Sequence, residues 1–400
     1  MSEVFKITIT AVEPPADGAN VTVDYVGGIR TGNFSLAAVA DAVQALNRAM
    51  RDKHPAQSAL ETAGSALFMA LFNGAVGDAW RDAQTLAREH HTGVRLMLHC
   101  ELPLLIAVPW EYLYDAPRAQ WLALAADLSL VRSLPVTTIA PLSVPGKLRI
   151  LVMLSAPNDL PQLGGEHEWA NLQSAVVSAA IELIRVEPTY EALQGALRQH
   201  PPHVFHFIGH GDLVTVPPIT APGTLRHFNL VPESSSTVES HAQGALAFCQ
   251  TNGTHQLIAA DQLAILLGSC TTLRLALLNA CQGAVTDTRL AFAGVAQRLI
   301  QGGTAAVIAM QAPIYDDHAL RFSQEFYRAL ADGCGVEQAV GEGRRRINEV
   351  TWAWGIPSVY FCGAEPFRTA PLAEPEDHAP PPMRVTPPDS GAVIGGNVRT

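Results

Sequence analysis

Between Lys147 and Cys362, short apolar segments alternate with segments that have a helical pattern. The apolar segments include LRILVML (148–154), HVFHFIG (203–209), LRLALLNA (273–280) and TAAVIAM (304–310). Strands that are apolar along their whole length need cover on both faces, and the helical segments between them supply it. The sequence therefore predicts an α/β fold with a doubly wound, mainly parallel sheet and helices on both of its faces.

The residues before this pattern are organised differently. Two alternating segments, 4–10 and 20–26, predict a β-hairpin, and Ala-rich amphipathic segments follow from about 35 to 90. The Pro-, Ser- and Thr-containing connector PVTTIAPLSVPGK then marks a boundary near Ser143. We predict a smaller N-terminal α/β domain for regulation or recognition at 1–143, the main α/β domain at 144–364, and a Pro-rich linker or tail at 365–400.

Composition narrows the class of protein. A formal net charge of −11 disfavours direct nucleic-acid binding, because neutralising phosphates takes concentrated Lys and Arg. The one basic cluster, 344–346, is interpreted as a solvated helix face. No apolar run is as long as a membrane span, and the start MSEVFKITIT lacks a signal-peptide pattern, so we expect no membrane segment and a cytoplasmic location.

The six cysteines are scattered along the chain. They form no CxxC pair and no Cys/His cluster at metal spacing, so the sequence predicts neither a disulfide framework nor a metal site. Five of them are interpreted as small buried apolar residues: Cys100, Cys249, Cys270, Cys334 and Cys362.

Two strand ends carry groups capable of chemistry. His210, in IGHGD, follows an apolar strand and lies between Gly209 and Gly211, which let the backbone turn sharply. Cys281, in NACQG, follows another such strand. Because functional groups gather at the carboxyl ends of parallel strands, we expect the imidazole and the thiol on one rim. The pair predicts a cysteine–histidine acyl-transfer site, with the backbone N–H groups of Gly211 and Cys281 as oxyanion donors.

Two further histidines and one aromatic motif have structural interpretations. Alternation places His203 and His206 on opposite faces of their strand. We interpret His206 as a hydrogen-bonded core or supporting residue, and His203 as incidental. In PWEYLYD, Trp110 and Glu111 are interpreted as an aromatic anchor and its satisfied partner between domains.

Several segments resemble a known family. PHVFHFIGHGD, LRLALLNACQGA and GGTAAVIAMQAPIYDDHALRFSQEFYRAL, in this order, resemble the CHAT domain, a caspase-like (clan CD) branch of cysteine proteases found in many bacterial proteins. PWEYLYD, KLRILVMLSAP, GGEHEW and WGIPSVYFCG are also similar to it, and the resemblance covers roughly residues 95–364. NACQG is similar to the caspase signature Q-A-C-[RQG]-G, with Asn279 in place of Gln.

The resemblance implies a cysteine endopeptidase with a caspase-like fold. His210 would be the general base and Cys281 the nucleophile, the acyl-enzyme would be a thioester, and no metal or organic cofactor would be needed. Family members often act in bacterial, including antiviral, defence or in regulated cell death. The implied partners are a protein substrate and an activating protein or fused domain.

The resemblance also implies where specificity lies. In related folds, the residue two before the cysteine lines the pocket for the side chain that precedes the cut, and here that residue is Asn279. Asn279 is neutral where enzymes that cut after Arg or Lys commonly carry Asp. The candidates that could still place an acid there are Asp212, Asp316 and Asp317.

Other functions remain open. A glutamine-amidotransferase-like hydrolase would carry its base after the cysteine, and the only core histidine there is His318, so the order of residues disfavours it. A catalytically silent caspase-like scaffold acting by protein–protein interaction is the main alternative. The insertion from 213 to about 259 is expected to be irregular, either a simple surface loop or a segment that flanks the substrate cleft and orders or is cut on activation.

Overall fold

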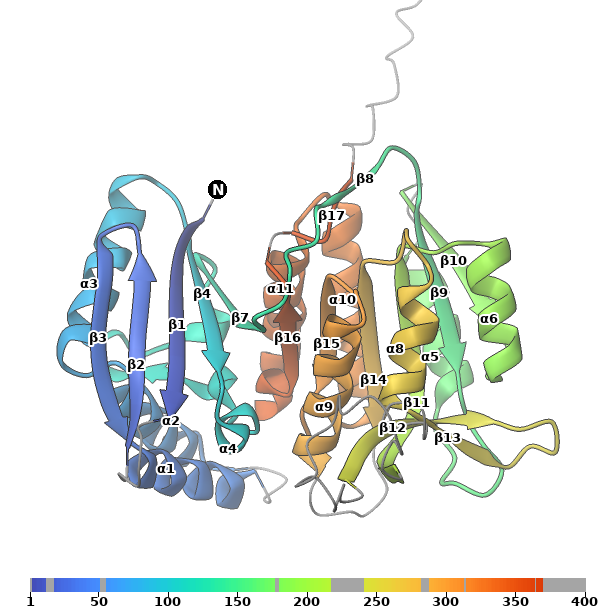
Figure 1. The fold of residues 1–400 in the computed structure, drawn as a ribbon, viewed down its shortest axis with the longest axis horizontal. Helices are drawn as coiled ribbons and strands as arrows, with labels where there is room; N and C mark the ends of the chain where they lie inside the picture. Colours follow the sequence, from blue (N-terminus) through green and yellow to red (C-terminus); the bar gives the residue numbers. More distant parts are fainter. Residues whose placement is uncertain are drawn as a thin grey trace, which may run out of the picture. The chain divides into compact units, whose positions relative to one another are not determined.

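One sheet joins the N-terminal and C-terminal parts of the chain (Figure 1). The computed structural model describes residues 2–11, 18–50, 55–176, 180–216, 241–281, 288–312, 314–363 and 365–369. Within them, the main sheet has 13 strands, in the order β10-β9-β11-β14-β15-β16-β7-β4-β1-β2-β3, with β12 beside β11 and β13 beside β12.

The C-terminal part of this sheet is mainly parallel. Its parallel strands are β9 (Leu148–Leu154), β10 (Ile181–Val186), β11 (Val204–Val216), β14 (Leu275–Cys281) and β15 (Ala306–Met310). β16 (Pro357–Phe361) runs antiparallel to β15. The helices are α5 (Gly165–Ala175), α6 (Tyr190–Gln199), α8 (Ala260–Gly268), α9 (Thr288–Gln301), α10 (Asp316–Ala331) and α11 (Val336–Asn348).

Helices cover both faces of these strands. In β14, Leu275 and Leu277 pack into the apolar layer that contains α5, α10 and α11, whereas Ala276 and Leu278 pack with α6, α8 and α9. Successive side chains of a strand point to opposite faces, and here both faces are buried, so the strands are apolar along their whole length. The predicted α/β class, with a mainly parallel sheet covered on both faces, is confirmed.

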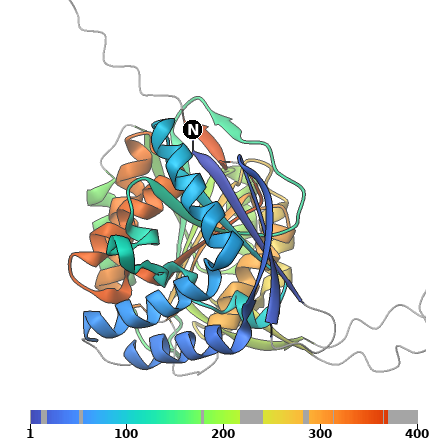
Figure 2. The same cartoon turned by 90° about the vertical axis from the view of Figure 1, so that its left-hand side faces the viewer.

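The N-terminal part adds four strands and three helices to the described fold. Its main elements are β1 (Glu3–Ala11), β2 (Gly18–Tyr25), β3 (Gly28–Ser35), α1 (Leu36–Ala49), α2 (Gln57–Leu71), α3 (Gly74–Glu89) and β4 (Val94–Cys100). β1 and β2 pair antiparallel, which confirms the predicted hairpin. Phe5 and Ile7 are fully buried whereas Val4 is 44% exposed, so helices cover one face only (Figure 2).

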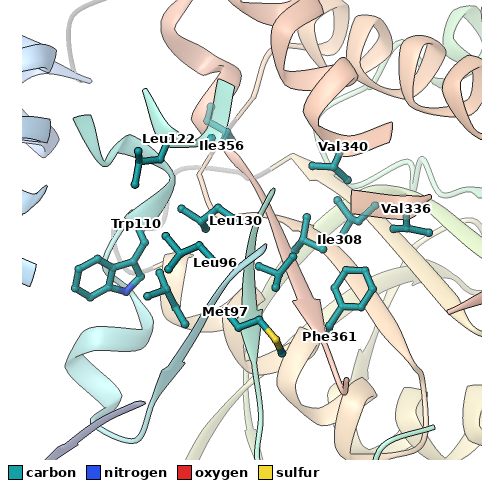
Figure 3. Close-up of a cluster of buried hydrophobic side chains, with 14 of the residues drawn as sticks. Leu96, Met97, Trp110, Leu122, Leu130, Ile308, Val336, Val340, Ile356 and Phe361 are labelled. Carbon is teal, nitrogen blue, oxygen red and sulfur yellow. The ribbon is translucent and has the colours of Figure 1, made fainter. Parts of the chain in front are cut away.

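β7 (Leu128–Ser133) connects the two parts of the sheet. It lies between β4 and β16 and is parallel to both. Figure 3 shows the apolar cluster at this junction, where Leu96 and Leu130 from one part meet Ile308 and Phe361 from the other. Residues 1–370 form one compact unit, and strands from both sides of residue 143 belong to the same sheet. The division into two domains at residue 143 stays a prediction.

Short elements complete the described chain. They are α4 (Pro103–Ile106), η1 (Trp110–Tyr112), β5 (Tyr114–Asp115), η2 (Ala116–Arg118), β6 (Gln120–Trp121), η3 (Leu122–Leu124), β8 (Leu142–Val144), η4 (Trp352–Gly355) and β17 (Phe367–Thr369). β17 pairs with β8, so the predicted tail from residue 365 begins with a short strand. The rest of that tail, 370–400, lies outside the described residues.

A buried ionic cluster also spans the junction, and it corrects one interpretation. Glu111 is fully buried and pairs with Arg132, while the Arg344 Nη2 lies 4.0 Å from the same carboxylate. Arg344 is only 2% exposed, so the interpretation of 344–346 as a solvated face is wrong for Arg344. It is right for Arg346, which is exposed, whereas Arg345 is half-buried and also donates to the Leu124 carbonyl. Trp110 and Glu111 are both buried and hydrogen-bonded, as interpreted, whereas their position between two domains stays a prediction.

The insertion after Leu213 is more regular than expected. β11 continues to Val216, and β12 (His241–Cys249) and β13 (His255–Ala259) pair antiparallel beside it. The small residues of HAQGALAFC hide the alternation that marks a strand, which is why the sequence did not indicate β12. Residues 217–240, with most of the polar stretch, lie outside the described part.

The cysteine and membrane expectations have mixed outcomes. Of the five cysteines expected to be buried, Cys270 and Cys362 are, whereas Cys100, Cys249 and Cys334 are partly exposed.

Among the helices of the described residues, no single one is long and apolar enough to cross a membrane. The pair α2 and α3, which is bent by 103°, is long and apolar enough only when the two helices are taken together.

Candidate active site

His210 and Cys281 are opposite each other on neighbouring parallel strands. They are register partners where β11 pairs with β14. Neighbouring strands lie about 4.8 Å apart, so register partners are close along the backbone. The structure describes the side chain of His210, which is 5% exposed, but only the backbone of Cys281. The two residues predicted to act together are therefore adjacent at the level of the backbone.

A backbone carbonyl orients the imidazole of His210. Its Nε2 lies 2.8 Å from the carbonyl oxygen of Pro161. Because a carbonyl oxygen only accepts, Nε2 carries the proton and Nδ1 is left as the basic nitrogen. An aspartate has this orienting role in a Ser-His-Asp triad. Sequence reasoning found no third residue here, and no residue type could have indicated a main-chain acceptor.

The loop that carries Pro161 is fixed at both of its ends. At the start, the Ser155 amide donates to the Ile208 carbonyl (2.8 Å) and its hydroxyl donates to the Ala247 carbonyl (2.6 Å). At the end, the Gly164 amide donates to Asp316 Oδ2 at 3.1 Å. The Pro161 carbonyl is thus held between β11, β12 and the first turn of α10.

The proposed oxyanion donors lie on the same two strands. Gly211 follows His210 in β11 and is the register partner of Leu246 in β12, and Cys281 ends β14. The role of their N–H groups stays a prediction.

Asn279 has a buried acidic partner that sequence reasoning missed. Two residues before Cys281, it is itself buried, and its Nδ2 donates to Glu168 Oε1 at 2.8 Å. Burial raises the pKa of the Glu168 carboxyl to about 8; the hydrogen bond from Asn279 opposes this rise and Asp316 adds to it. Glu168 lies in the first turn of α5, within the GGEHEW segment that resembles the family. The resemblance of that segment to the family could have indicated an acidic residue at the site, but the sequence does not distinguish Glu166 from Glu168.

The other acidic candidates differ in position. Asp316 is exposed but close enough to Glu168 to raise its pKa. Asp212 is exposed and accepts from the amide of the next residue, and Asp317 is exposed 3.8 Å from its neighbour His318. Of the three aspartates, the structure brings Asp316 to the Asn279–Glu168 pair.

The other two histidines of this segment, His206 in β11 and His203 just before it, have structural contacts. His206 is fully buried, its ring centroid lies 5.6 Å from that of Tyr327, and burial lowers its pKa to about 3. Its core position is confirmed, but its expected hydrogen bond is not found, since neither ring nitrogen has a partner within the described residues. His203 is also buried, and its Nδ1 accepts from the Arg149 amide at 2.9 Å. It caps a strand entrance.

No metal centre emerges from the described residues, because they contain no group of three or more His, Cys, Asp or Glu side chains that could hold an ion. The described side chains that this region offers for chemistry are the imidazole of His210, the carboxamide of Asn279 and the buried carboxyl of Glu168.

Glu168 makes a testable contribution to the pH dependence of stability. Its folded pKa of about 8 exceeds the ordinary 4.5. Between these values the unfolded state ionises while the folded state keeps its proton, so stability falls as pH rises, by about 5 kcal/mol at most. Glu168→Gln keeps the acceptor for Asn279 and removes the titration. We expect the variant to match the wild type in urea unfolding at pH 4.5 and to exceed it at pH 8.5.

The matched control is Glu166→Gln, on the same turn. Glu166 is exposed, and the hydrogen bond from Arg185 lowers its pKa. This variant should not become more stable than the wild type at pH 8.5. Parallel stability–pH curves for wild type and Glu168→Gln would contradict a protonated, buried Glu168.

Comparisons with known proteins bear on the family of this chain. A model of the CHAT domain family matches residues 62–354. Among solved structures, the separase–securin complex of Saccharomyces cerevisiae is similar, with 11% sequence identity and a TM-score of 0.46. That match covers 92% of this chain, which spans about 30% of the length of the other. No curated protein matches the sequence. Because the family model covers well over half of the residues, this chain belongs to the CHAT domain family, the caspase-like family that its motifs resemble.

Proposed function

We propose that this chain is a cysteine endopeptidase that cleaves a partner protein through Cys281 and His210. The observation that carries the proposal is the register pairing of these two residues on neighbouring parallel strands of a CHAT-family chain. A cysteine thiol and a histidine imidazole are the nucleophile and base that acyl transfer requires.

The proposed reaction uses the tautomer that Pro161 selects. Nδ1 of His210 takes the proton of the Cys281 thiol, and the thiolate attacks the carbonyl carbon of the scissile bond. The amides of Gly211 and Cys281 donate to the oxyanion. His210 then gives its proton to the leaving amine, which leaves a thioester on Cys281. Water, activated by the same imidazole, hydrolyses the thioester and regenerates the thiol.

The hydrogen bond from Nε2 to the Pro161 carbonyl supports this reaction in two ways. It fixes which nitrogen is basic, and the carbonyl oxygen continues to accept a hydrogen bond from Nε2–H when the ring becomes imidazolium. Because the ring is buried, its orientation does not depend on solvent.

Specificity is proposed to depend on Asn279 and its acidic neighbours. Below pH 8 Glu168 is mostly protonated, so the wall beside Asn279 offers neutral polar groups, with the charge of Asp316 at the surface. We expect the side chain that precedes the cut to contact this wall. Glu168 and Asn279 therefore determine preference at that position.

The biological setting is proposed from family membership. CHAT proteases commonly work in bacterial defence or regulated cell death, switched on by partner proteins or fused domains. A cytoplasmic protease with a protein substrate and a protein activator fits this pattern.

The deciding experiment is labelling with thiol-directed peptide electrophiles. Wild type and Cys249→Ser should be modified at Cys281, located by mass spectrometry, and Cys281→Ser should not. Cys249 is the matched control because it is a partly exposed cysteine whose Sγ lies 3.8 Å from Ser155 Oγ, at the start of the Pro161 loop. Equal labelling of wild type and Cys281→Ser, with no cleavage of a candidate partner protein by either, would favour the silent scaffold instead.

A further inference from the structure

The contacts around Pro161 involve two exposed residues that the reaction itself does not use. Asp159 lies two residues before Pro161, and His255 begins β13. We propose that Asp159 and His255 are positioning residues that tie the loop of Pro161 to the β12–β13 turn and so keep its carbonyl on the His210 imidazole. The catalytic consequence rests on the proposed function, whereas the orientation of the ring is a separate and measurable property.

Asp159 makes a two-point contact with one residue. Its Oδ1 accepts from the His255 amide at 2.9 Å, and its Oδ2 lies 2.7 Å from His255 Nδ1. One residue earlier, the Asn158 amide donates to the Gly253 carbonyl at 2.9 Å. Three contacts therefore connect two consecutive loop residues to one turn, which fixes both the distance and the direction of the loop.

The turn that receives these contacts is internally braced. The Asn252 carboxamide oxygen accepts from the amide (3.0 Å) and the hydroxyl (2.7 Å) of Thr254. Gln250 Nε2 donates to the His255 carbonyl at 3.0 Å. A turn with this many internal bonds offers a stiff support for the neighbouring loop.

Gly253 lets the loop approach closely. Its φ is +84°, and a Cβ at this position would lie 2.4 Å from Asn158 Nδ2. Glycine is needed here for two reasons, the left-handed backbone and the space that Asn158 occupies. A side chain at residue 253 would push away the loop that carries Pro161.

The Asp159–His255 contact acts on orientation and not on global stability. Both side chains are well exposed, at 38% and 40%. Exposed ion pairs contribute little to folding. Without this anchor, the loop would keep its contacts at Ser155, Asn158 and Gly164 but would lose the two bonds of Asp159, and the Pro161 carbonyl could leave the imidazole. The β12–β13 turn thereby influences His210 without touching it.

The direct test is the tautomer of His210, read by NMR on the full chain with ¹⁵N-labelled histidine. Wild type should show a single Nε2–H tautomer, assigned by its loss in His210→Ala. Asp159→Ala and, independently, Gly253→Ala should give averaged ring nitrogen shifts. Asp159→Asn keeps an acceptor for the His255 amide and should restore the wild-type pattern.

The matched control is Asp261→Ala, which removes another exposed ion pair between elements, Asp261 with Arg298. It should leave the His210 signals unchanged. Circular dichroism of each variant confirms folding, and the two routes through Asp159 and Gly253 do not depend on each other.

The second readout is the pH profile of Cys281 alkylation by iodoacetamide. Loss of a well-placed base costs up to about 10²–10⁴-fold in rate, and partial misplacement should cost about tenfold at pH 7 in Asp159→Ala. The profile should also move toward that of an ordinary thiol, a change that a merely structural role would not produce.

The outcomes separate the two proposals. If Asp159→Ala and Gly253→Ala keep the single Nε2–H tautomer, the positioning role is wrong, whatever the protein cleaves. If the tautomer is lost in both variants, the positioning role holds. An ordinary wild-type Cys281 profile that His210→Ala does not change would then count against the protease alone.

Discussion

Replacing Glu111 by alanine is expected to lower the free energy of unfolding by about 3–5 kcal/mol, the effect typical of removing one partner from a buried ion pair. Glu111 Oε2 accepts from Arg132 Nη2 at 2.6 Å and from Gln311 Nε2 at 2.7 Å. Although burial opposes it, Glu111 keeps the pKa of Arg132 above its usual range, and burial lowers the pKa of Arg344 to about 10. Without Glu111, the buried guanidinium groups of Arg132 and Arg344 would lose the carboxylate that lies between them and compensates their charge. Urea unfolding at pH 7 measures the loss.

The control for this prediction is Glu101→Ala. Glu101 is exposed and lies 3.8 Å from His99, so its removal should change stability by less than about 0.5 kcal/mol. If Glu111→Ala and Glu101→Ala lowered the free energy of unfolding by similar amounts, the buried ion pairs of Glu111 would not be what stabilises the junction.

This cluster also explains how the chain is assembled. Glu111 and Arg132 precede the predicted boundary at 143, whereas Gln311 and Arg344 follow it, and all four meet beside the β7–β16 pairing. The family match likewise begins at residue 62, upstream of that boundary. The N-terminal part therefore contributes to the core of the C-terminal part, beyond any role as a separate module.

The sequence predicted the elements whose pattern is strong. The segments 148–154 and 304–310 are continuous apolar runs, and each is a strand. β3 was missed because GIRTGNFS has two large apolar residues and no clear alternation. β12 was missed for a similar reason. Where small or polar residues form a strand, pairing with a neighbour determines the structure, and a local pattern carries little information.

The site was predictable in part. The rule that functional groups gather at strand ends singled out His210 and Cys281, but the predicted strand end and turn at His210 are wrong, because β11 continues through it to Val216 to pair with β12. The register of the two residues depends on how helices and loops pack. Glu168 and Asn279 are 111 residues apart, and only the fold brings them together. Pro161 acts through its carbonyl, which every residue has. Arg344 looked like part of a surface run because its burial depends on Glu111, far away in the chain.

The last prediction concerns the base. His210→Ala is expected to slow cleavage, and alkylation of Cys281 at pH 7, by about 10²–10⁴-fold, the usual contribution of a positioned general base. The reason is that Nδ1, the nitrogen left free by the bond to Pro161, takes the thiol proton. His200→Ala, which removes an exposed histidine at the end of α6, should retain the wild-type rate.

The pH profile distinguishes a lost base from a disturbed fold. In the wild type, the rate should rise with pH as the Cys281 thiol gives up its proton with the help of His210. In His210→Ala, the remaining reaction should rise only toward the ionisation of a free thiol, near pH 8.5. A uniform decrease in rate with an unchanged profile would indicate structural damage, because the reacting species would still ionise as before. Wild-type rate and profile in His210→Ala would leave Cys281 without its proposed base and contradict the dyad.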